Sequence, residues 1–416
     1  MNRHKSTVLI FSGYYLPGYR GGGPIRSLAN LVEVLGDELD FRVVTLNRDF
    51  GSSEPYAGVR NNTWQRVGKA EVFYLSPRNV TLPFLRRLIN STTYDILYLN
   101  SLFSPGFTIM PLLLRRLGLL KEGKTIIAPR GTLSKGALKI KPIKKILFIS
   151  LAKLTGLCRH VIWQASSVHE KDDILAVFKK ASIVASDPIA AVSYSPSSGP
   201  LGPVKTSDAK RTGSLKVIFL SRISPMKNLY DALGMLRGLK GQVSFDIFGP
   251  LEDRAYWGKC QKAMNALPTN IRASYKGELG HDEVAEVFTD HDLFLFPTHG
   301  ESFGHVIIEA LMAGCPVLIS DRTPWRDLDA AGVGWSLPLD KPERFTDILQ
   351  QCVDMEGDEL RSLSQRAREY GLKKYINQES FQQNRDLFCF ALNGTPLSAS
   401  GGKENIDHPR SQRIPR

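Results

Sequence analysis

The sequence has few cysteines, and their spacing forms no recognisable site. The five are scattered along 416 residues and include no C-x-x-C pair: Cys158, Cys260, Cys315, Cys352 and Cys389. Their odd number and the missing pair argue against a zinc site or a redox dithiol. We expect buried thiols in a reducing compartment.

Long apolar runs are also missing from the N-terminus. It reads MNRHKSTVLIFSGYYLPG, a basic start followed by a short apolar run that ends before Gly13 and Pro17. This run is too brief for the core of a signal peptide or for a membrane-spanning helix. We therefore expect a first β-strand in a cytoplasmic protein.

Acidic residues are nearly absent from one segment, and the formal net charge of the chain is +13. Between Arg115 and Arg159 many lysines and arginines accompany the single acid Glu122. Within this segment, LKIKPIKKILFISLAKLTGL alternates lysines with apolar residues, as an amphipathic element on an anionic membrane surface does. A solvated basic face beside a core helix is the other interpretation. A nucleic acid partner is disfavoured, because aromatic interleaving and a recognition motif are missing.

The composition that is present suits a large globular protein. Hydrophobic residues make up 42% and charged residues 23% of the chain, which is enough for a large core and two domains. Strand-like and helix-like runs alternate in both halves, as in parallel sheets with helical crossovers. We expect an α/β protein with two Rossmann-like, doubly wound domains. The expected parts are a first domain at 1–195, a linker at 196–212, a second domain at 213–375, a helix at 376–392 that could return to the first domain, and a disordered tail at 393–416.

Residues 300–320 read GESFGHVIIEALMAGCPVLIS and place two glutamates in different settings. Glu309 stands among apolar residues of an expected helix, where an unpaired carboxylate costs on the order of several kcal/mol. Glu301 lies in a loop after an expected strand at 293–297, and such loops bind ligands in parallel sheets. Their spacing corresponds to about 12 Å along a helix axis, longer than the roughly 5 to 9.5 Å between glycosidase carboxylates. We expect them to contact different parts of one extended ligand.

This E-x7-E arrangement, with FG after the first Glu and with EA and G-x-P at the second, resembles the retaining glycosyltransferases of family 4, which have the GT-B fold. Four further stretches resemble that family in order and spacing, from about Tyr14 to Trp335: GGGPIRSLANLVEVL, FLSRISPMKN, FDIFGPLED and YKGELGHDEVAEVF. The resemblance implies two domains that face each other across a cleft, and a nucleotide diphosphate sugar as the donor.

The resemblance also assigns roles to residues, with Glu301, Arg222 and Lys227 in catalytic positions. Arg222 and Lys227 follow a strand, where cationic donors can hold a diphosphate, each charge-assisted bond contributing about 1.5 to 3 kcal/mol. We expect both to face solvent when no donor is bound. Glu301 is expected at the donor sugar and Glu309 at the ribose. The residues expected to bind the nucleotide sugar are Gly22, Gly23, Gly249, Leu279, Phe303, Gly304, His305 and Glu309.

A metal ion is not expected. The sequence has no D-x-D motif flanked by apolar strand residues, and Asp172 and Asp173 lie in a polar helical segment. The resemblance implies that Arg222, Lys227 and helix N-termini stabilise the diphosphate leaving group instead. No cofactor is expected beyond the donor substrate, a UDP- or GDP-sugar.

The acceptor half departs from the family pattern. Many members carry a His near the reaction centre, where this chain has Pro129, Arg130 and Gly131, a pattern of a subset from bacterial polysaccharide pathways. We take Arg130 and Glu170 as candidate acceptor-side residues. A Glu170 that follows Ser166 and Ser167 is equally an ordinary helix-capping arrangement.

The predicted function is the retaining transfer of a hexose-type sugar to a glycan or lipid-linked acceptor in cell-surface polysaccharide biosynthesis. The protein is expected in the cytoplasm, where it can associate peripherally with the inner membrane face. Two alternatives stay open. A sugar-nucleotide epimerase of the same fold would need acid and base groups on both faces of one sugar, and we identify no such set. A noncatalytic membrane-binding scaffold would not need Glu301, Arg222 and Lys227.

Overall fold

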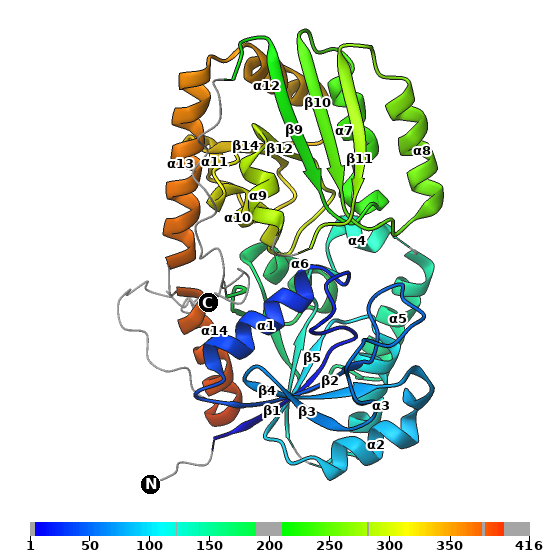
Figure 1. The fold of residues 1–416 in the computed structure, drawn as a ribbon. Coiled ribbons are helices and arrows are strands. Elements are labelled where there is room, and N and C mark those ends of the chain that lie inside the picture. The colour runs from blue at the N-terminus through cyan, green and yellow to red at the C-terminus, as the bar shows by residue number, and fades with distance from the viewer. Residues whose placement is uncertain are drawn as a thin grey trace, which may run out of the picture.

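The computed structural model describes residues 5–121, 123–140, 142–188, 210–280, 283–376 and 379–394. They form two α/β units, each built on its own sheet and stacked one above the other (Figure 1). The expected linker up to residue 209 and the expected tail from residue 395 lie outside the described residues. Within the described ranges, no helix is long and apolar enough to cross a membrane.

The first sheet has eight strands in the order β3-β4-β2-β1-β5-β6-β7-β8. Its central strands β1 and β5 are buried along their whole length, which suits the continuous apolar runs TVLIF and ILYLN. The strands are β1 (Thr7–Phe11), β2 (Asp40–Leu46), β3 (Trp64–Val67), β4 (Ala70–Leu75), β5 (Ile96–Asn100), β6 (Lys124–Ala128), β7 (Ile162–Ala165) and β8 (Ile183–Val184).

One edge of this sheet differs from the parallel arrangement predicted from the sequence. Strand β3 pairs with β4 in the antiparallel sense. Only Gly68 and Lys69 separate the two strands, and Gly68 has φ 56°. A two-residue connection can form a hairpin but cannot form the long crossover that parallel strands need.

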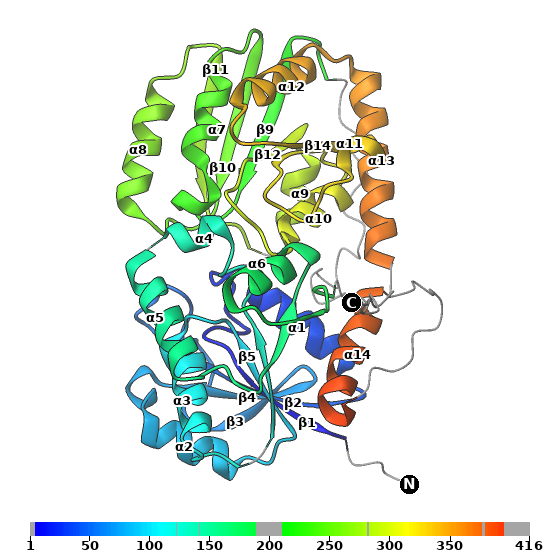
Figure 2. The ribbon, with the colours of Figure 1, turned by 180° about the vertical axis from the view of Figure 1, so that it is seen from behind.

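Helices cover both faces of the first sheet (Figure 2). They are α1 (Gly23–Leu35), α2 (Leu82–Ser91), α3 (Met110–Arg116) preceded by the π-helical turn Pro105–Ile109, α4 (Lys135–Lys139), α5 (Pro142–Leu154) and α6 (Val168–Phe178), with a 3₁₀ turn at Pro77–Asn79. Helix α1 begins directly after the glycine run that follows β1.

The second sheet is parallel, with the order β11-β10-β9-β12-β13-β14. Its strands are β9 (Ser214–Leu220), β10 (Gln242–Phe248), β11 (Ile271–Gly277), β12 (Leu293–Phe296), β13 (Val317–Ser320) and β14 (Gly334–Leu337). Its helices are the 3₁₀ turn Pro225–Lys227, α7 (Leu229–Leu236), α8 (Arg254–Asn265), α9 (Val284–Thr289), α10 (His305–Met312), α11 (Leu328–Ala331), α12 (Pro342–Asp354) and α13 (Gly357–Ile376).

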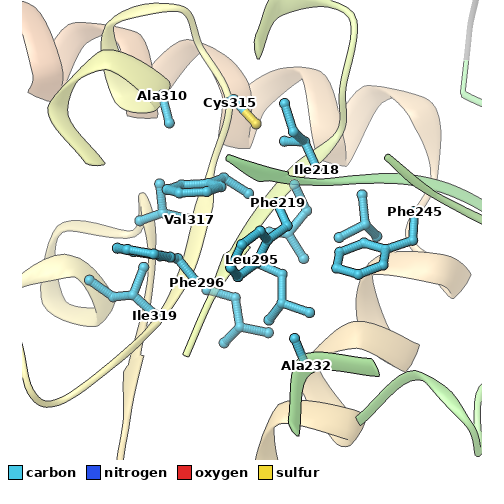
Figure 3. Packing of buried hydrophobic residues seen from close by; sticks show 14 of the residues in the cluster. Ile218, Phe219, Ala232, Phe245, Leu295, Phe296, Ala310, Cys315, Val317 and Ile319 are labelled. Atoms are coloured by element: carbon cyan, nitrogen blue, oxygen red, sulfur yellow. The ribbon is translucent and has the colours of Figure 1, made fainter. Parts of the chain in front are cut away.

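The core of the second unit fixes the strand ends that carry the site loops. Phe219, Phe245 and Phe296 are fully buried from three neighbouring strands and pack with Val317 and Ala310 (Figure 3). Phe219 contacts Phe245 and Phe296 with ring centroids 6.5 and 6.0 Å apart. Because interiors of this kind are close-packed, the loops that leave β9 and β12 start from rigid points.

The last helix, α14 (Glu379–Asn393), lies against the first unit rather than the second (Figure 1). Leu387 and Phe388 are buried in the core of the first sheet, where the Phe388 ring centroid is 6.1 Å from those of Phe41 and of Tyr98. Arg385 forms an ion pair with Glu38. The chain therefore returns to its first sheet after completing the second.

Candidate active site

The loops at the carboxyl ends of the two sheets contact each other. Ser166, which follows β7, has its hydroxyl 3.4 Å from the carbonyl oxygen of Ser302, which follows β12. Gly131, after β6, lies so close to Ser302 that an added Cβ would be 3.2 Å from the Ser302 Cβ. Since ligands of parallel sheets bind at these ends, the space between the two units is the candidate site.

Arg222 follows β9 and lies at the rim of this site, 30% exposed in its side chain. Its guanidinium is 3.0 Å from the Glu252 carboxylate and 5.8 Å from the ring centroid of Phe50 in the first unit. A Cβ at Gly22 would be 3.5 Å from Arg222 Nε, so the glycine loop passes directly beside this cation. Arg222 therefore touches both units.

Lys227 lies deeper than the sequence predicted. Its side chain is 12% exposed, forms an ion pair with Glu301, and has its ammonium 5.6 Å from the ring centroid of Phe296. The expectation that both cations face solvent in the empty cleft is therefore wrong for Lys227. Glu301 supplies the counter-charge that this largely buried ammonium needs.

Glu301 is held by the loop that follows β12. Its Oε1 lies 3.2 Å from the hydroxyl of fully buried Thr298, and its backbone N–H donates to the Arg322 carbonyl at 3.0 Å. Helix α10 begins only at His305, so Glu301 is not helical. The separation of about 12 Å from Glu309, which assumed a continuous helix, therefore does not apply.

Glu309 lies on α10, is 6% exposed, and forms an ion pair with Arg26 of α1 in the other unit. This pair supplies the partner that its apolar sequence neighbours could not. One turn earlier on α10, His305 Nε2 is 3.1 Å from the hydroxyl of Ser27. Helices α1 and α10, one from each unit, are thus joined by two polar contacts.

Behind these contacts lies a buried polar network centred on Asp187. The Ser27 hydroxyl donates to the Asp187 carboxylate at 2.6 Å, and His305 Nε2 is 3.8 Å from the same group. Burial lowers the pKa of His305 to about 4, the charges of Arg26 and Arg130 act in the same direction, and Asp187 opposes them. His305 is therefore neutral at pH 7.

Three glycines of the predicted set have conformations that other residues avoid. Gly22 (φ 73°) precedes α1 and Gly304 (φ 82°) precedes α10, and among the described residues neither helix start receives a side-chain cap. Pro24 has no N–H and the Ile25 N–H donates to the Gly22 carbonyl, so the start of α1 offers an anion the N–H of Gly23. The start of α10 offers those of His305 and Val306, because the Ile307 N–H donates to the Gly304 carbonyl. Gly249 has φ 129°, and a Cβ there would collide with the carbonyl of Ser221. Gly23 faces His305, with an added Cβ 3.6 Å from its ring.

The two remaining predicted donor residues, Phe303 and Leu279, follow β12 and β11 of the second sheet. The Phe303 ring packs against His305 and Trp325 with centroids 4.8 and 5.6 Å apart. Leu279 follows β11 and packs on the second core. Its neighbour Glu278 accepts hydrogen bonds from Tyr19 Oη at 3.2 Å and Arg20 Nε at 3.0 Å, which closes this end of the cleft.

Arg130 and Glu170, the predicted acceptor-side residues, are buried supports. Arg130 is 4% exposed, forms an ion pair with Asp187, and donates to Asn100 Oδ1 at 2.7 Å and to Tyr98 Oη at 2.9 Å. Burial would lower the pKa of Arg130, but the charges of Asp187, Tyr98 and Glu170 raise it above the ordinary value. The positive charge of Arg130 is therefore paired with groups inside the first unit.

Glu170 lies near the start of α6 and is 3% exposed. Its carboxylate accepts hydrogen bonds from the backbone N–H of Gly131 at 2.5 Å and of Ser166 at 2.8 Å, and from the Ser166 hydroxyl at 2.7 Å. The Ser167 hydroxyl caps the helix by accepting from the Glu170 N–H. Glu170 thereby joins the loops after β6 and β7, which are the loops that touch Ser302.

The sequence did not identify Arg26, Ser27, Asp187 and Thr298. Arg26 and Ser27 stand one turn inside the helix that follows the glycine run, and Asp187 lies in ASDPIAAV. Arg26, Ser27 and Asp187 have partners far away along the chain, so a linear pattern gives no sign of them. Thr298 lies only three residues before its partner Glu301, but a lone threonine after a strand is not a distinctive signal. Over the described residues, no cluster of three or more His, Cys, Asp or Glu side chains is arranged to hold a metal ion.

Residues 204–373 match the family model of glycosyl transferases group 1. Over 110 residues the chain is 31% identical to the GDP-mannose-dependent alpha-mannosyltransferase of Mycobacterium tuberculosis (strain CDC 1551 / Oshkosh). That alignment covers 26% of this chain and 26% of the relative, so the chain spans about a quarter of the curated relative that it matches.

Several solved structures share the whole fold at low sequence identity. Anabaena Alr3699/HepE, solved with UDP and glucose, has a TM-score of 0.63 and 15% identity, over 93% of this chain and 98% of that one. Sucrose-phosphate synthase from Thermosynechococcus elongatus has a TM-score of 0.63 and 16% identity, over 93% and 100%. An alpha,alpha-trehalose-phosphate synthase (UDP-forming) from Burkholderia vietnamiensis has a TM-score of 0.62 and 13% identity, over 96% and 100%.

Proposed function

Since the chain has the GT-B fold and its residues 204–373 carry a glycosyl transferases group 1 domain, we propose that it is a retaining glycosyltransferase. It moves a hexose-type sugar from a nucleotide diphosphate sugar to a glycan or lipid-linked acceptor. The observation that carries this proposal is the Lys227–Glu301 ion pair at the carboxyl ends of the second sheet, together with Arg222, which lies beside Gly22 of the first unit.

The diphosphate of the donor is proposed to lie between Arg222 and the starts of α1 and α10. Arg222 is partly exposed there, α1 offers the Gly23 N–H, and α10 offers the N–H groups of His305 and Val306. Guanidinium groups bind phosphate oxygens with paired, charge-assisted hydrogen bonds. Helix starts add partial positive charge.

Lys227 and Glu301 are proposed to contact the two groups that the breaking bond joins, with the bound donor replacing their direct ion pair. The Glu301 carboxylate accepts hydrogen bonds from hydroxyls of the donor sugar, and the Lys227 ammonium neutralises the charge that develops on the leaving diphosphate. A preorganised cation in a half-buried site stabilises such charge more than it would in water. A divalent metal is not needed for this role.

Glu309 is proposed to accept hydrogen bonds from the ribose hydroxyls of the nucleotide. Its ion pair with Arg26 orients the carboxylate in apolar surroundings. Because Arg26 belongs to the first unit and Glu309 to the second, their ion pair forms only when the two units face each other as they do here.

The retaining outcome rests on the family resemblance and on Arg130, which stands where many members carry a His. Arg130 is buried and paired with Asp187, so it is not proposed as a base for the acceptor. The donor is proposed to be a UDP- or GDP-hexose; the mannosyltransferase relative is named for GDP-mannose, and HepE was solved with UDP and glucose. The proposed pathway is cell-surface polysaccharide biosynthesis.

The first test is a thermal-shift panel of UDP, GDP and their hexose conjugates, followed by turnover assays with the donor that stabilises most. A stabilising donor that is consumed only when a sugar acceptor is added, with the anomeric configuration retained by NMR, supports the proposal. Conversion of the nucleotide sugar without acceptor would instead identify an epimerase. No stabilisation by any member of the panel would contradict a nucleotide sugar site.

A further inference from the structure

Helix α5 lies on the outer flank of the first unit (Figure 2). Many of its large apolar side chains are exposed. Only Ile149 and Ala152 of its described side chains are buried. Residues spaced by three or four share one side of a helix, and this spacing joins a set of large exposed side chains. They are Ile143 (80% exposed), Ile146 (62%), Leu147 (59%), Leu151 (49%) and Leu154 (83%).

Neighbouring elements carry further exposed apolar side chains. Arg116 of α3 donates to the carbonyl of Thr155 at 2.9 Å, and Arg115 donates to those of Arg159 and His160 at 2.9 Å, so α3 lies beside the end of α5. We call the combined surface the α5 face; it comprises Leu113, Leu117, Ile140, Ile143, Ile146, Leu147, Leu151 and Leu154. Most large hydrophobic side chains that are exposed among the described residues gather here, which marks an interaction surface.

Cations surround the α5 face. Lys139, Lys144, Lys153 and Arg159 are exposed, and the segment from Arg115 to Arg159 contains the single acid Glu122. A second copy of this chain would bring like charges together at such a face, which disfavours self-association. An anionic lipid surface offers both partners at once, phosphates for the cations and acyl chains for the apolar side chains.

We propose that the α5 face docks on an anionic bilayer, with α5 lying in the plane of the headgroups. Its 13 residues span roughly 20 Å, too short to cross the hydrocarbon core of about 30 Å. The apolar side chains enter the acyl boundary, and the lysines remain at the level of the phosphates. Such binding is reversible and weakens at high salt.

Helix α5 contacts the candidate active site through α4. Lys145 of α5 donates to the Ala137 carbonyl of α4 at 2.6 Å and lies 5.2 Å from the Phe103 ring centroid. On the other side of α4, Gly136 abuts the second unit so closely that a Cβ would be 2.7 Å from the His299 carbonyl oxygen. His299 belongs to the loop that carries Glu301. A docked α5 thus places this loop beside the bilayer, which, if the proposed function holds, favours a lipid-linked acceptor.

The test is co-sedimentation of the full chain with phosphatidylcholine vesicles, with and without phosphatidylglycerol, at low and high salt. The wild type should bind only the anionic vesicles and dissociate at high salt. Lys139→Glu/Lys144→Glu should weaken partitioning by at least about tenfold. Ile143→Ser/Leu147→Ser should weaken it too, because the lysines alone then attract the headgroups without insertion.

The matched control is Lys259→Glu/Lys262→Glu on α8, an identical charge change on another exposed helix, which should bind like the wild type. No binding of the wild type to anionic vesicles, or an equal loss in the control, would overturn the proposal. So would sedimentation analysis that finds a dimer dispersed by Ile143→Ser/Leu147→Ser, since the face would then serve a second copy. These assays contain no sugar donor, so their outcome is independent of the proposed transferase activity.

Discussion

At the scale of single residues, the charges of the cleft occur in pairs, and these pairs predict unequal effects of substitution. Arg222→Ala removes a partly exposed cation whose partner Glu252 is also partly exposed, so the fold should survive. Loss of one preorganised donor to developing charge should lower kcat by about 10²- to 10³-fold. The measurement is steady-state turnover together with a thermal melt. Arg272→Ala, an exposed arginine on β11, is the matched control.

Lys227→Ala should lower turnover as strongly and should also cost stability, because it leaves Glu301 half-buried without its counter-charge. Wild-type turnover in a folded Arg222→Ala or Lys227→Ala protein would exclude these residues from the site.

Substitutions of Glu309 and Glu301 should have different effects in a binding assay. Glu309→Gln should weaken binding of the free nucleoside diphosphate by about tenfold or more, the value of a hydrogen bond to a charged group. Glu301→Gln should mainly reduce turnover of the nucleotide sugar. Arg26→Ala should act like Glu309→Gln, because Arg26 is the partner that orients Glu309.

The control for this division is a nucleoside diphosphate that lacks both ribose hydroxyls. Its affinity should be the same for the wild type, Glu309→Gln and Arg26→Ala. If Glu301→Gln and Glu309→Gln weaken the normal diphosphate equally, the assignment of one carboxylate to the ribose and the other to the sugar is refuted.

His305 should make stability depend on pH. Burial depresses its pKa to about 4 in the folded state, so the unfolded state binds the proton more tightly. Stability should therefore be intact above pH of about 6.5 and should be lost as pH falls towards 4, by up to about 3 kcal/mol from this residue. Denaturant unfolding from pH 7 to 4.5 should show a shallower decline for His305→Gln. Parallel declines for both proteins would show that His305 does not titrate in this way.

The residues that the sequence predicted are those with a linear signature. Glu301, Glu309, Arg222 and Lys227 all follow strands of the second sheet. In the structure Glu309 and Arg222 contact the first unit, and Lys227 pairs with Glu301. Arg26 and Asp187 have no such signature, because their roles depend on contacts with residues of other elements. Burial of Lys227 was not predicted for the same reason, since its counter-charge comes from a different loop.

At the scale of elements, α14 should behave as part of the first unit's core. Phe388 is 1% exposed and packs on Phe41 and Tyr98, so Phe388→Ala should destabilise that unit by about 3 to 5 kcal/mol. Phe390→Ala, on a less buried side of the same helix, is the control and should cost less. Equal unfolding midpoints for the two variants would contradict a core role for α14.

Continuous apolar runs predicted most of the central strands, because a strand buried on both faces needs apolar residues at every position. Strands β3, β4, β7, β8 and β14 were missed. WQRV and IWQA are short and mixed in polarity, and β8 has only two residues. The run AEVFYL of β4 does carry the apolar signal and was overlooked. Helix α5 was predicted as amphipathic, but the sequence could not decide which side the protein covers. Packing against the first sheet decides that only Ile149 and Ala152 face inward.

At the scale of the whole molecule, the predicted GT-B fold is confirmed by structures that share it at about 15% identity. This level of the prediction succeeded because alternation of apolar strands and helices largely determines the fold class. The way in which the two units face each other follows from side-chain pairs such as Arg26–Glu309, which only the structure reveals.

Turnover is predicted to be independent of divalent metal. If Arg222, Lys227 and the starts of α1 and α10 neutralise the leaving diphosphate, saturating EDTA should change kcat by less than about twofold. The measurement is turnover after chelation, with Mg²⁺ added back as the control. A strict requirement for Mg²⁺ or Mn²⁺ would overturn the assignment of charge neutralisation to these groups.

The return of α14 to the first sheet sets an order of maturation during synthesis. Residues 7–184, which hold every strand of that sheet, leave the ribosome long before Leu387 and Phe388 exist. Domains otherwise tend to fold in the order in which they are made. Here the second unit can complete its core before Phe388 has been synthesised and can pack on Phe41 and Tyr98. A nascent chain that terminates early therefore exposes the earliest-made unit, and its apolar surface is the one that chaperones and proteases meet.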